Sequence, residues 1–348
     1  MATKQPTIHD VARAAGVAIS SVSRVLNGNT SNREMIERVR RAVEEVGYVP
    51  SAVAQSLKTR QTGQVAFAME DIGNAAYLAM VRAIQPVLRD AGFRLLLHST
   101  GADVNDEIEV LDSLSQRYVD GLVLCPIRVT DRHIEALRRA AVPVVVIGSL
   151  PDDVPVDNVR ADSRLGAALA MEHLLEQGCR RIALVDGPAD TVPGRSRHLG
   201  YQDGLRAAGI PERTELISFT DFSFGQGAGA AAAMLRLQQP PDAFFAANDV
   251  LAMGVLQAVR EAGLSVPRDV AVVGMDDTEL AATAWPPLSS VSLGAAERGR
   301  LAAELLLGRL ADQDRAPKRV TVRPRLVVRA SSVPARPDAV RPPHEGSR

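Results

Sequence analysis

A segment near the N-terminus carries side chains that suit contact with nucleic acid. Helical spacing from Ile19 onward places Val22, Val25 and Leu26 on one side of a predicted helix. The other side then carries Ile19, the small hydroxyl groups of Ser20, Ser21 and Ser23, and the guanidinium of Arg24. Hydroxyls and a guanidinium can hydrogen-bond to base edges and phosphates. The pattern therefore predicts a helix that lies against DNA.

Two further predicted helices hold this helix in place. Thr7 and Asp10 are expected to cap a first helix, and Gly16 allows the turn after it. Ser31, with Glu34 three residues later, is expected to cap a third helix. The buried side chains expected in these two helices are Ile8, Val11, Ala12, Ala15, Ile36, Val39, Val43 and Val46. A helix-turn-helix domain follows. The alternative is a small solvated hairpin, which we disfavour because every apolar position fits the motif.

The charge of the chain is divided unevenly. Residues 1–60 hold nine Lys and Arg against five Asp and Glu, a net charge of +4. Residues 61–348 hold thirty-one against thirty-six, a net charge of −5. A basic head on an acidic body is the distribution expected of a phosphate-contacting module attached to a sensor domain.

Beyond residue 61, apolar runs of strand length alternate with amphipathic helical stretches. This alternation predicts parallel sheets, and about 270 residues exceed a comfortable single core, so two lobes are expected with a break near residues 156–162. The expected strands are 64–69, 94–98, 121–125, 142–147, 181–186, 216–220, 243–246 and 270–274. The expected helices are 78–91, 105–117, 131–140, 163–177, 200–208, 225–237 and 251–262.

Polar side chains follow several of these strands, at the edge where open α/β sheets bind ligands. They are Asp71, Asn74, Ser99, Ser149, Arg197, Phe222, Asn248, Asp249, Asp276 and Asp277. Carboxylates, an amide and a guanidinium around an aromatic ring suit a polyhydroxylated ligand, because hydroxyls both donate and accept hydrogen bonds. For Asp249 and Asp277, helix capping is the favoured role.

The motifs DVARAAGV, SSVSRVLN, GYVPSAVAQSL, ANDVLAMG and VVGMDD, in this order, resemble the LacI/GalR family of bacterial transcriptional regulators over residues of about 5 to 330. The resemblance implies an all-α helix-turn-helix head and an α/β two-lobed core like that of periplasmic binding proteins, with parallel sheets. It gives a DNA-binding domain over 1–49, a hinge over 50–60, and an effector-binding and dimerisation core over 61–330. The N-lobe would take about 61–160 and 292–320, and the C-lobe about 161–291 and 321–330, with late crossovers near 288–293 and 317–325.

For the head, the resemblance implies that Ile19 and Ser20 read bases and that Arg24 reaches a base edge or a phosphate. Contacts to the DNA backbone would come from His9, Ser21, Ser23 and Asn27. Simple solvent exposure is the alternative for each serine. Ala18 departs from the family, which usually has Ser or Thr as this helix cap, and an alanine there costs about 1 kcal/mol of helix stability.

The hinge carries its own chemistry. Pro50 ends the preceding helix, and Ser51, where the family usually has Asn, can cap a short one that runs to Leu57. So short a helix is unstable alone, so we expect it to be disordered off DNA and to form when two copies pack over the minor groove. The resemblance implies that Leu57 is a wedge between bases and that Lys58 and Arg60 contact phosphates. The alternative is a plain flexible tether.

For the core, the resemblance implies effector contacts from Arg197, Phe222, Asn248 and Asp276. Tyr77 is what remains of an aromatic pair, Leu293 replaces the usual Gln, and Ser149 replaces a commoner charged residue. The expected effector is a sugar or sugar phosphate, with a nucleoside or another metabolite as the alternative. The expected protein is a homodimeric repressor of carbohydrate-utilisation genes on a near-palindromic double-stranded operator, with no cofactor. Release from the operator by the sugar is the commoner case in the family, and co-repression by the effector is the alternative.

Other function classes fit poorly. Residues 225–230, GQGAGA, match a weak dinucleotide-binding string without the strand that should precede it. Cys125 and Cys179 are too few for a metal site, the six His show no ligand spacing, and no nucleophile has a base, so an enzyme is not expected.

The core alone would also resemble a periplasmic sugar-binding protein, but residues 1–25 lack a secretion signal. With no long apolar run, a cytoplasmic protein without membrane contact is expected. Residues 331–348, rich in Pro and charge without leucine heptads, predict a disordered tail and a dimer rather than a tetramer.

Overall fold

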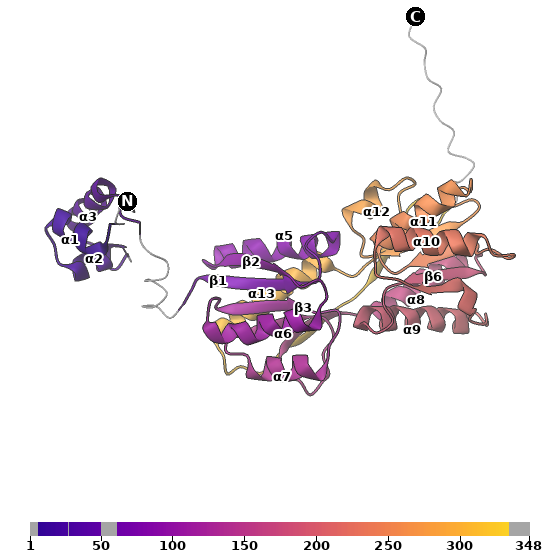
Figure 1. Cartoon of the computed structure of the whole chain (residues 1–348), viewed down its shortest axis with the longest axis horizontal. Coiled ribbons are helices and arrows are strands. Elements are labelled where there is room, and N and C mark those ends of the chain that lie inside the picture. The colour runs from indigo at the N-terminus through magenta and orange to yellow at the C-terminus, as the bar shows by residue number, and fades with distance from the viewer. Residues whose placement is uncertain (1–5, 27, 50–60, 334–348) are drawn as a thin grey trace, which may run out of the picture. The chain divides into compact units, whose positions relative to one another are not determined.

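The computed structural model describes residues 6–26, 28–49 and 61–333 of the chain. It divides into two compact units that meet between Thr62 and Gly63 (Figure 1). Both fold predictions, an α-helical head and a two-lobed α/β core, are confirmed.

The N-terminal unit consists of α1 (Ile8–Ala15), α2 (Ile19–Leu26) and α3 (Arg33–Val46). Its small core is made by side chains at helical spacing, namely Val11, Ala12, Ala15, Val22, Val39 and Ala42. The predicted cap of α1 is present, since the backbone N–H and Oγ1 of Thr7 donate to Asp10 Oδ2 at 2.9 and 2.8 Å. The predicted cap of α3 is wrong by one residue. Asn32, not Ser31, caps this helix, and its Oδ1 accepts from the Met35 N–H at 3.0 Å.

The N-lobe of the second unit is a parallel six-stranded sheet in the order β11-β5-β4-β3-β1-β2. Its strands are β1 (Gln64–Met69), β2 (Arg94–Ser99), β3 (Gly121–Cys125), β4 (Val144–Ile147), β5 (Asp157–Ala161) and β11 (Arg319–Val322). Along β1, Val65, Phe67 and Met69 face one hydrophobic layer, and Ala66 and Ala68 face the other. The first layer lies under α5 (Ala75–Asp90) and α13 (Ala295–Ala311), and the second under α6 (Val104–Ser113) and α7 (Asp131–Arg139).

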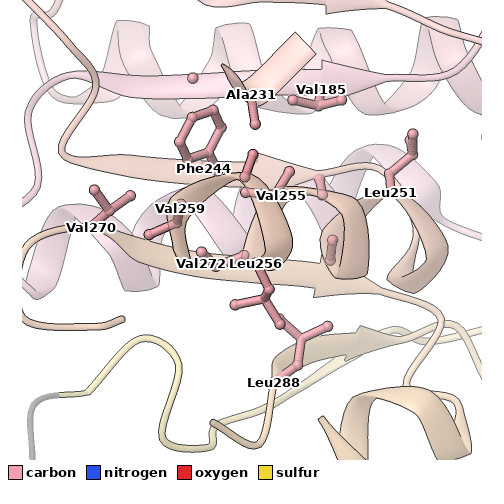
Figure 2. Packing of buried hydrophobic residues seen from close by; sticks show 14 of the residues in the cluster. Val185, Ala231, Phe244, Leu251, Val255, Leu256, Val259, Val270, Val272 and Leu288 are labelled. Atoms are coloured by element: carbon pink, nitrogen blue, oxygen red, sulfur yellow. The ribbon is translucent and has the colours of Figure 1, made fainter. Parts of the chain in front are cut away.

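The C-lobe sheet has the order β12-β10-β9-β8-β6-β7, in which only β12 runs antiparallel to its neighbour. Its strands are β6 (Ile182–Asp186), β7 (Ile217–Phe219), β8 (Ala243–Ala246), β9 (Ala271–Met275), β10 (Ser289–Ser292) and β12 (Arg325–Val327). Its helices are α8 (Ser163–Glu176), α9 (Val192–Ala207), α10 (Phe224–Leu235), α11 (Asp249–Glu261) and α12 (Glu279–Thr283). Figure 2 shows how Val255 and Val259 of α11 meet Phe244 of β8 in one of its two hydrophobic layers.

The chain passes between the lobes three times, after β5, between β10 and α13, and between β11 and β12. The double return implied by the resemblance is therefore present, and α13 lies beside α5 although they are far apart in sequence (Figure 1). Since β11 pairs with β5, the N-lobe extends to Val322.

The predicted start of the tail at residue 331 is also wrong. Ser331 and Ser332 are buried in the C-lobe. The Ser331 N–H donates to the Pro287 carbonyl at 3.0 Å, and Ser332 Oγ lies 2.6 Å from His173 Nε2. Residues 334–348 of the predicted tail lie outside the described residues. Among the residues that are described, no helix is both long and apolar enough to cross a membrane.

Candidate functional site

The outer face of α2 is largely as predicted. Ser20 and Arg24 are exposed, Ile19 is 40% exposed, and Ser23 is half-buried. Ser21 corrects the prediction, because it is only 8% exposed and lies next to Val22 on the inner side of the helix. The face available to DNA is therefore narrower than expected.

The start of α2 has the weakness expected from Ala18. The Ala18 carbonyl accepts from the Ser21 and Val22 N–H groups at 2.9 and 3.2 Å, but an alanine side chain cannot accept one. His9 is exposed on α1. Five predicted DNA-contacting residues lie outside the described part of the chain: Asn27, Ser51, Leu57, Lys58 and Arg60.

A cavity lies between the two lobes, where the carboxyl ends of strands from both sheets meet. Its volume is about 120 Å³, and it opens to solvent. Seven of the predicted effector residues line it: Asn74, Tyr77, Ser149, Arg197, Phe222, Asn248 and Asp276. Leu293, which replaces the family's usual Gln, lines it too.

Ser99 does not line this cavity and corrects the prediction. It ends β2, the outermost strand of its sheet, where it is exposed. Its Oγ donates to the Glu70 carbonyl at 3.0 Å. The rule that ligands bind beyond strand ends fails here because the end of an edge strand lies away from the opposite lobe.

Arg197 is the centre of the C-lobe wall. It lies on α9, which begins eight residues earlier than expected. Thr191 caps this helix, and Pro193 is tolerated because it stands in the first helical turn. The Arg197 side chain is buried, with Nη2 3.9 Å from Asp276 Oδ1 and Cζ 5.7 Å from the centre of the Phe222 ring. A buried cation is thus held between a carboxylate and an aromatic face.

Two asparagines that cap helices also line the cavity. Asn74 Oδ1 accepts from the Ala76 N–H at 3.0 Å at the start of α5. Asn248 Oδ1 accepts from the Leu251 N–H at 2.7 Å at the start of α11. Each cap uses the amide oxygen, which leaves the Nδ2 group as a donor for a ligand.

Asp249 and Asp277 do not cap helices as expected. Asp249 is buried, and its carboxylate accepts from Ser290 Oγ at 2.6 Å and from the Thr278 N–H at 2.7 Å. Burial, followed by the charge of Asp276, raises the pKa of Asp249 to about 7. Asp277 accepts from Arg329 Nη2 at 2.7 Å. Both residues hold the loop after β9 that carries Asp276.

Two charged residues at the cavity were missed from the sequence. Glu70 follows β1 directly, so the strand-end rule could have found it; its Oε2 accepts from Tyr77 Oη at 3.2 Å, and burial raises its pKa. Arg298 comes from α13, which the sequence reasoning did not predict, so nothing pointed to it.

Behind Arg197, Asp186 ends β6 with a fully buried side chain. Its Oδ1 accepts from the Gly187 N–H at 2.7 Å, while Oδ2 has no hydrogen-bond partner among the described residues. Burial raises the pKa of Asp186 to about 7, although the Arg197 charge acts in the opposite direction. The described residues contain no group of three or more His, Cys, Asp or Glu placed to hold a metal ion.

Comparison with known proteins agrees with this arrangement. The family described as "Bacterial regulatory proteins, lacI family" matches residues 7–51, and the "Periplasmic binding protein-like domain" matches residues 171–332. The ribose operon repressor of Escherichia coli (strain K12) is 36% identical over 330 residues, which cover 94% of this chain and 99% of that repressor. This chain belongs to the LacI family. As a LacI-family protein it is a DNA-binding transcriptional regulator and not an enzyme.

Other LacI-family proteins resemble it over almost their whole length. The regulator CelR of Thermobifida fusca is 36% identical over 337 residues, 94% of this chain and 98% of CelR. A solved CelR–cellobiose complex has a TM-score of 0.72 at 34% identity, covering 94% of this chain and all of that one. The lac repressor dimer bound to operator and the anti-inducer ONPF has a TM-score of 0.85 at 28% identity, covering 95% of this chain and all of that one.

Proposed function

We propose that this LacI-family regulator is a repressor of carbohydrate-utilisation genes that a small sugar-type effector releases from its operator. The observation that carries the proposal is the set of groups around the cavity. Arg197, Asp276 and Asn248 offer donors and acceptors beside the apolar ring of Phe222. This combination suits a sugar, whose hydroxyls need both kinds of partner and whose carbon face packs on an aromatic ring. The relatives named for ribose and bound to cellobiose point to the same chemistry.

In the proposed mechanism, two cytoplasmic protomers pair through their cores and place two copies of α2 on a near-palindromic operator. Ile19, Ser20 and Arg24 face the bases and phosphates. Residues 50–60 connect each head to a core whose cavity is built from both lobes. An effector that binds one arrangement of the lobes more tightly shifts the protein toward it, and operator affinity falls if that arrangement separates the hinges. The relative that was solved as a dimer on operator supports this assembly.

Arg197→Ala tests the proposal. Fluorescence anisotropy with labelled DNA from the upstream region of the gene would measure operator affinity while sugars are added. Wild type should bind and be released, whereas Arg197→Ala should bind equally well and resist release. Arg195→Ala is the matched control, because Arg195 is exposed on the same helix and does not line the cavity. An unchanged dose response in Arg197→Ala would place effector binding elsewhere, and a wild type that does not bind operator would remove the proposal.

A further inference from the structure

Two guanidinium groups, that of the buried Arg197 and that of the half-buried Arg298, face the cavity from opposite lobes. Arg197 belongs to α9 of the C-lobe, and Arg298 belongs to α13 of the N-lobe. The Nε atom of each is buried and has no hydrogen-bond partner among the residues that the structure describes. Both positive charges act on the same carboxylate, that of Asp276, which lies 3.9 Å from Arg197. Two cations therefore converge on one carboxylate.

The other ionisable groups that line the cavity are held by different partners or are neutral. Glu70 accepts a hydrogen bond from Tyr77, and the cation that acts on it is Arg128 rather than either of the two facing guanidinium groups. Burial raises the pKa of Tyr77 well above its usual value and that of the Cys125 thiol to about 12, so both are neutral at physiological pH. Among the groups that line the cavity, Asp276 is thus the carboxylate on which both guanidinium groups act.

A buried guanidinium without an acceptor is costly. Its charge loses hydration and gains no hydrogen bond in return, which is also why burial lowers the pKa of Arg298. Buried polar atoms without a hydrogen-bond partner are rare in folded proteins, and a bound ligand would supply the acceptor here. A guanidinium fits the oxygens of a carboxylate or a phosphate, with two parallel hydrogen bonds in the favourable case. The missing acceptor is thus an anionic group.

We infer that the effector is an anionic sugar, with its carboxylate or phosphate bound between Arg197 and Arg298 and its hydroxyls bound by Asp276 and Asn248. This inference rests on the proposed function and narrows the effector from sugars in general to acidic ones. Asp276 then has two tasks, since it orients Arg197 and accepts from a ligand hydroxyl. Arg298 selects the charged ligand over a neutral one.

Matched ligands test the inference directly. Isothermal titration calorimetry on the full-length protein would compare glucose with glucuronate and glucose 6-phosphate, and galactose with galacturonate and galactose 6-phosphate. At least one acidic sugar should bind about tenfold or more tightly than its neutral partner, as expected for a charge-assisted pair. The sugar acids and the sugar phosphates form separate arms, so the result also identifies the anionic group.

Variants of α13 link the effect to Arg298. Arg298→Met should weaken binding of the acidic sugar by about tenfold or more and leave a neutral sugar unaffected. Arg300→Met is the matched control, since Arg300 is on the same helix, is paired with Glu304 at 2.6 Å, and does not line the cavity. It should bind every ligand as wild type does.

Urea unfolding without ligand distinguishes a role of Arg298 in ligand binding from a role in stabilising the fold. If Arg298 serves the ligand, Arg298→Met should be at least as stable as wild type, because an unpaired charge has been removed from a buried site. A loss of stability would make Arg298 a structural residue and overturn the inference. So would equal binding of neutral and acidic sugars, no binding of any acidic sugar, or no effect of Arg298→Met on binding. Operator release by a neutral sugar alone would overturn the inference and leave the proposed function intact.

Discussion

Two residues of the cavity wall hold backbone conformations that residues with side chains rarely adopt. Phe222 has φ +68° and Asp276 has φ +105°. Each such residue costs about 1 to 3 kcal/mol and persists only where its surroundings hold it. The Phe222 ring lies over Gly187, where a Cβ would come within 1.9 Å of it, and the Asp276 N–H donates to the Val291 carbonyl at 2.8 Å. The two side chains are therefore fixed before a ligand arrives.

Asp186 should make stability depend on pH. Its pKa is about 7 in the folded protein against an ordinary 3.8, so the folded state holds this proton more tightly than the unfolded state does. The stabilisation is fully present below the unfolded pKa and is lost as pH rises toward the folded one. Asp186→Asn keeps the acceptor for Gly187 without the charge. Urea unfolding should show it to be more stable than wild type at about pH 8, with the difference shrinking toward about pH 5.

Asp221 supplies a control of opposite sign. It is exposed, and hydrogen bonds from Ser223 lower its pKa. Asp221→Asn should lose stability relative to wild type as pH rises above the usual range of a carboxylate. If the free energies of unfolding of Asp186→Asn and wild type differ by the same amount at both pH values, Asp186 is ionised throughout and its pKa is not raised.

The cavity residues that follow central strands could be placed from the sequence, because parallel strands bring their carboxyl ends to one edge. Asn248, which follows β8, and Asp276, which follows β9, illustrate this. Ser99 fails because sequence does not reveal that its strand is at the edge of the sheet. Arg298 could not be placed, since it reaches the cavity from a helix that crosses back from the other lobe.

At the scale of elements, α5 and α13 pack so closely that the backbone of α13 lies directly against the backbone of α5. A Cβ at Gly299 of α13 would lie 2.7 Å from the Met80 carbonyl oxygen of α5. Gly299→Ala should therefore lower the free energy of unfolding by about 1 to 3 kcal/mol. Gly229→Ala, in α10 with no atom within 4 Å of the added Cβ, should instead gain up to about 1 kcal/mol. Urea unfolding measures both. Equal effects would mean that the helices can separate at little cost.

The hinge gives a second prediction at this scale. On the wedge role that the resemblance implies, Leu57→Ala should weaken operator binding by about tenfold or more, because unstacking a base step needs a large apolar side chain. Effector affinity should not change, since Leu57 belongs to the hinge and all the residues that line the cavity belong to the core. Fluorescence anisotropy with operator DNA measures operator affinity, and calorimetry with the effector measures effector affinity. Equal operator affinity in wild type and Leu57→Ala would rule out the wedge.

The elements that sequence could predict are those with a clear apolar pattern. All eight strands predicted from apolar runs are present. Six of them lie inside a sheet, where strands are buried on both faces, and β2 and β7 lie at an edge. The pattern gave no strand for β5, whose DNVRA sequence mixes polar with apolar residues. The first turns of α9 could not be predicted, because Pro193 and Gly194 have low helix propensity. Pro193 is accepted at the start of the helix. Glycine is needed at position 194, because a Cβ there would lie 2.3 Å from the Pro188 carbonyl oxygen.

At the scale of the whole core, a few polar contacts join the lobes around the cavity. Arg128 of the N-lobe donates to both carboxylate oxygens of Asp190 in the C-lobe, at 2.8 and 3.1 Å. The Val192 N–H donates to the Ile127 carbonyl at 2.9 Å beside this pair. These contacts hold the arrangement of lobes in which Arg197 and Arg298 face one cavity.

Asp190→Ala should weaken effector binding without destabilising either lobe. Because the carboxylate is largely exposed, the ion pair contributes about 1 kcal/mol or less, so effector affinity should fall by about two- to fivefold. Asp153→Ala is a control, since Asp153 pairs with Arg138 within the N-lobe. Calorimetry measures the affinities and urea unfolding the stabilities. Unchanged or tighter effector binding in Asp190→Ala would show that the pair does not favour the binding arrangement.

The interleaved path of the chain sets the order in which parts of the protein can be completed on the ribosome. The N-lobe lacks α13 and β11 until residue 322 has been made, and the C-lobe lacks β12 and its anchor at Ser331 and Ser332 until still later. The head, in contrast, has all three of its helices by Val46. A nascent chain thus contains all three helices of the DNA-binding unit long before it can form the effector cavity. Fragments released early in translation would retain the head but have no effector cavity to control it.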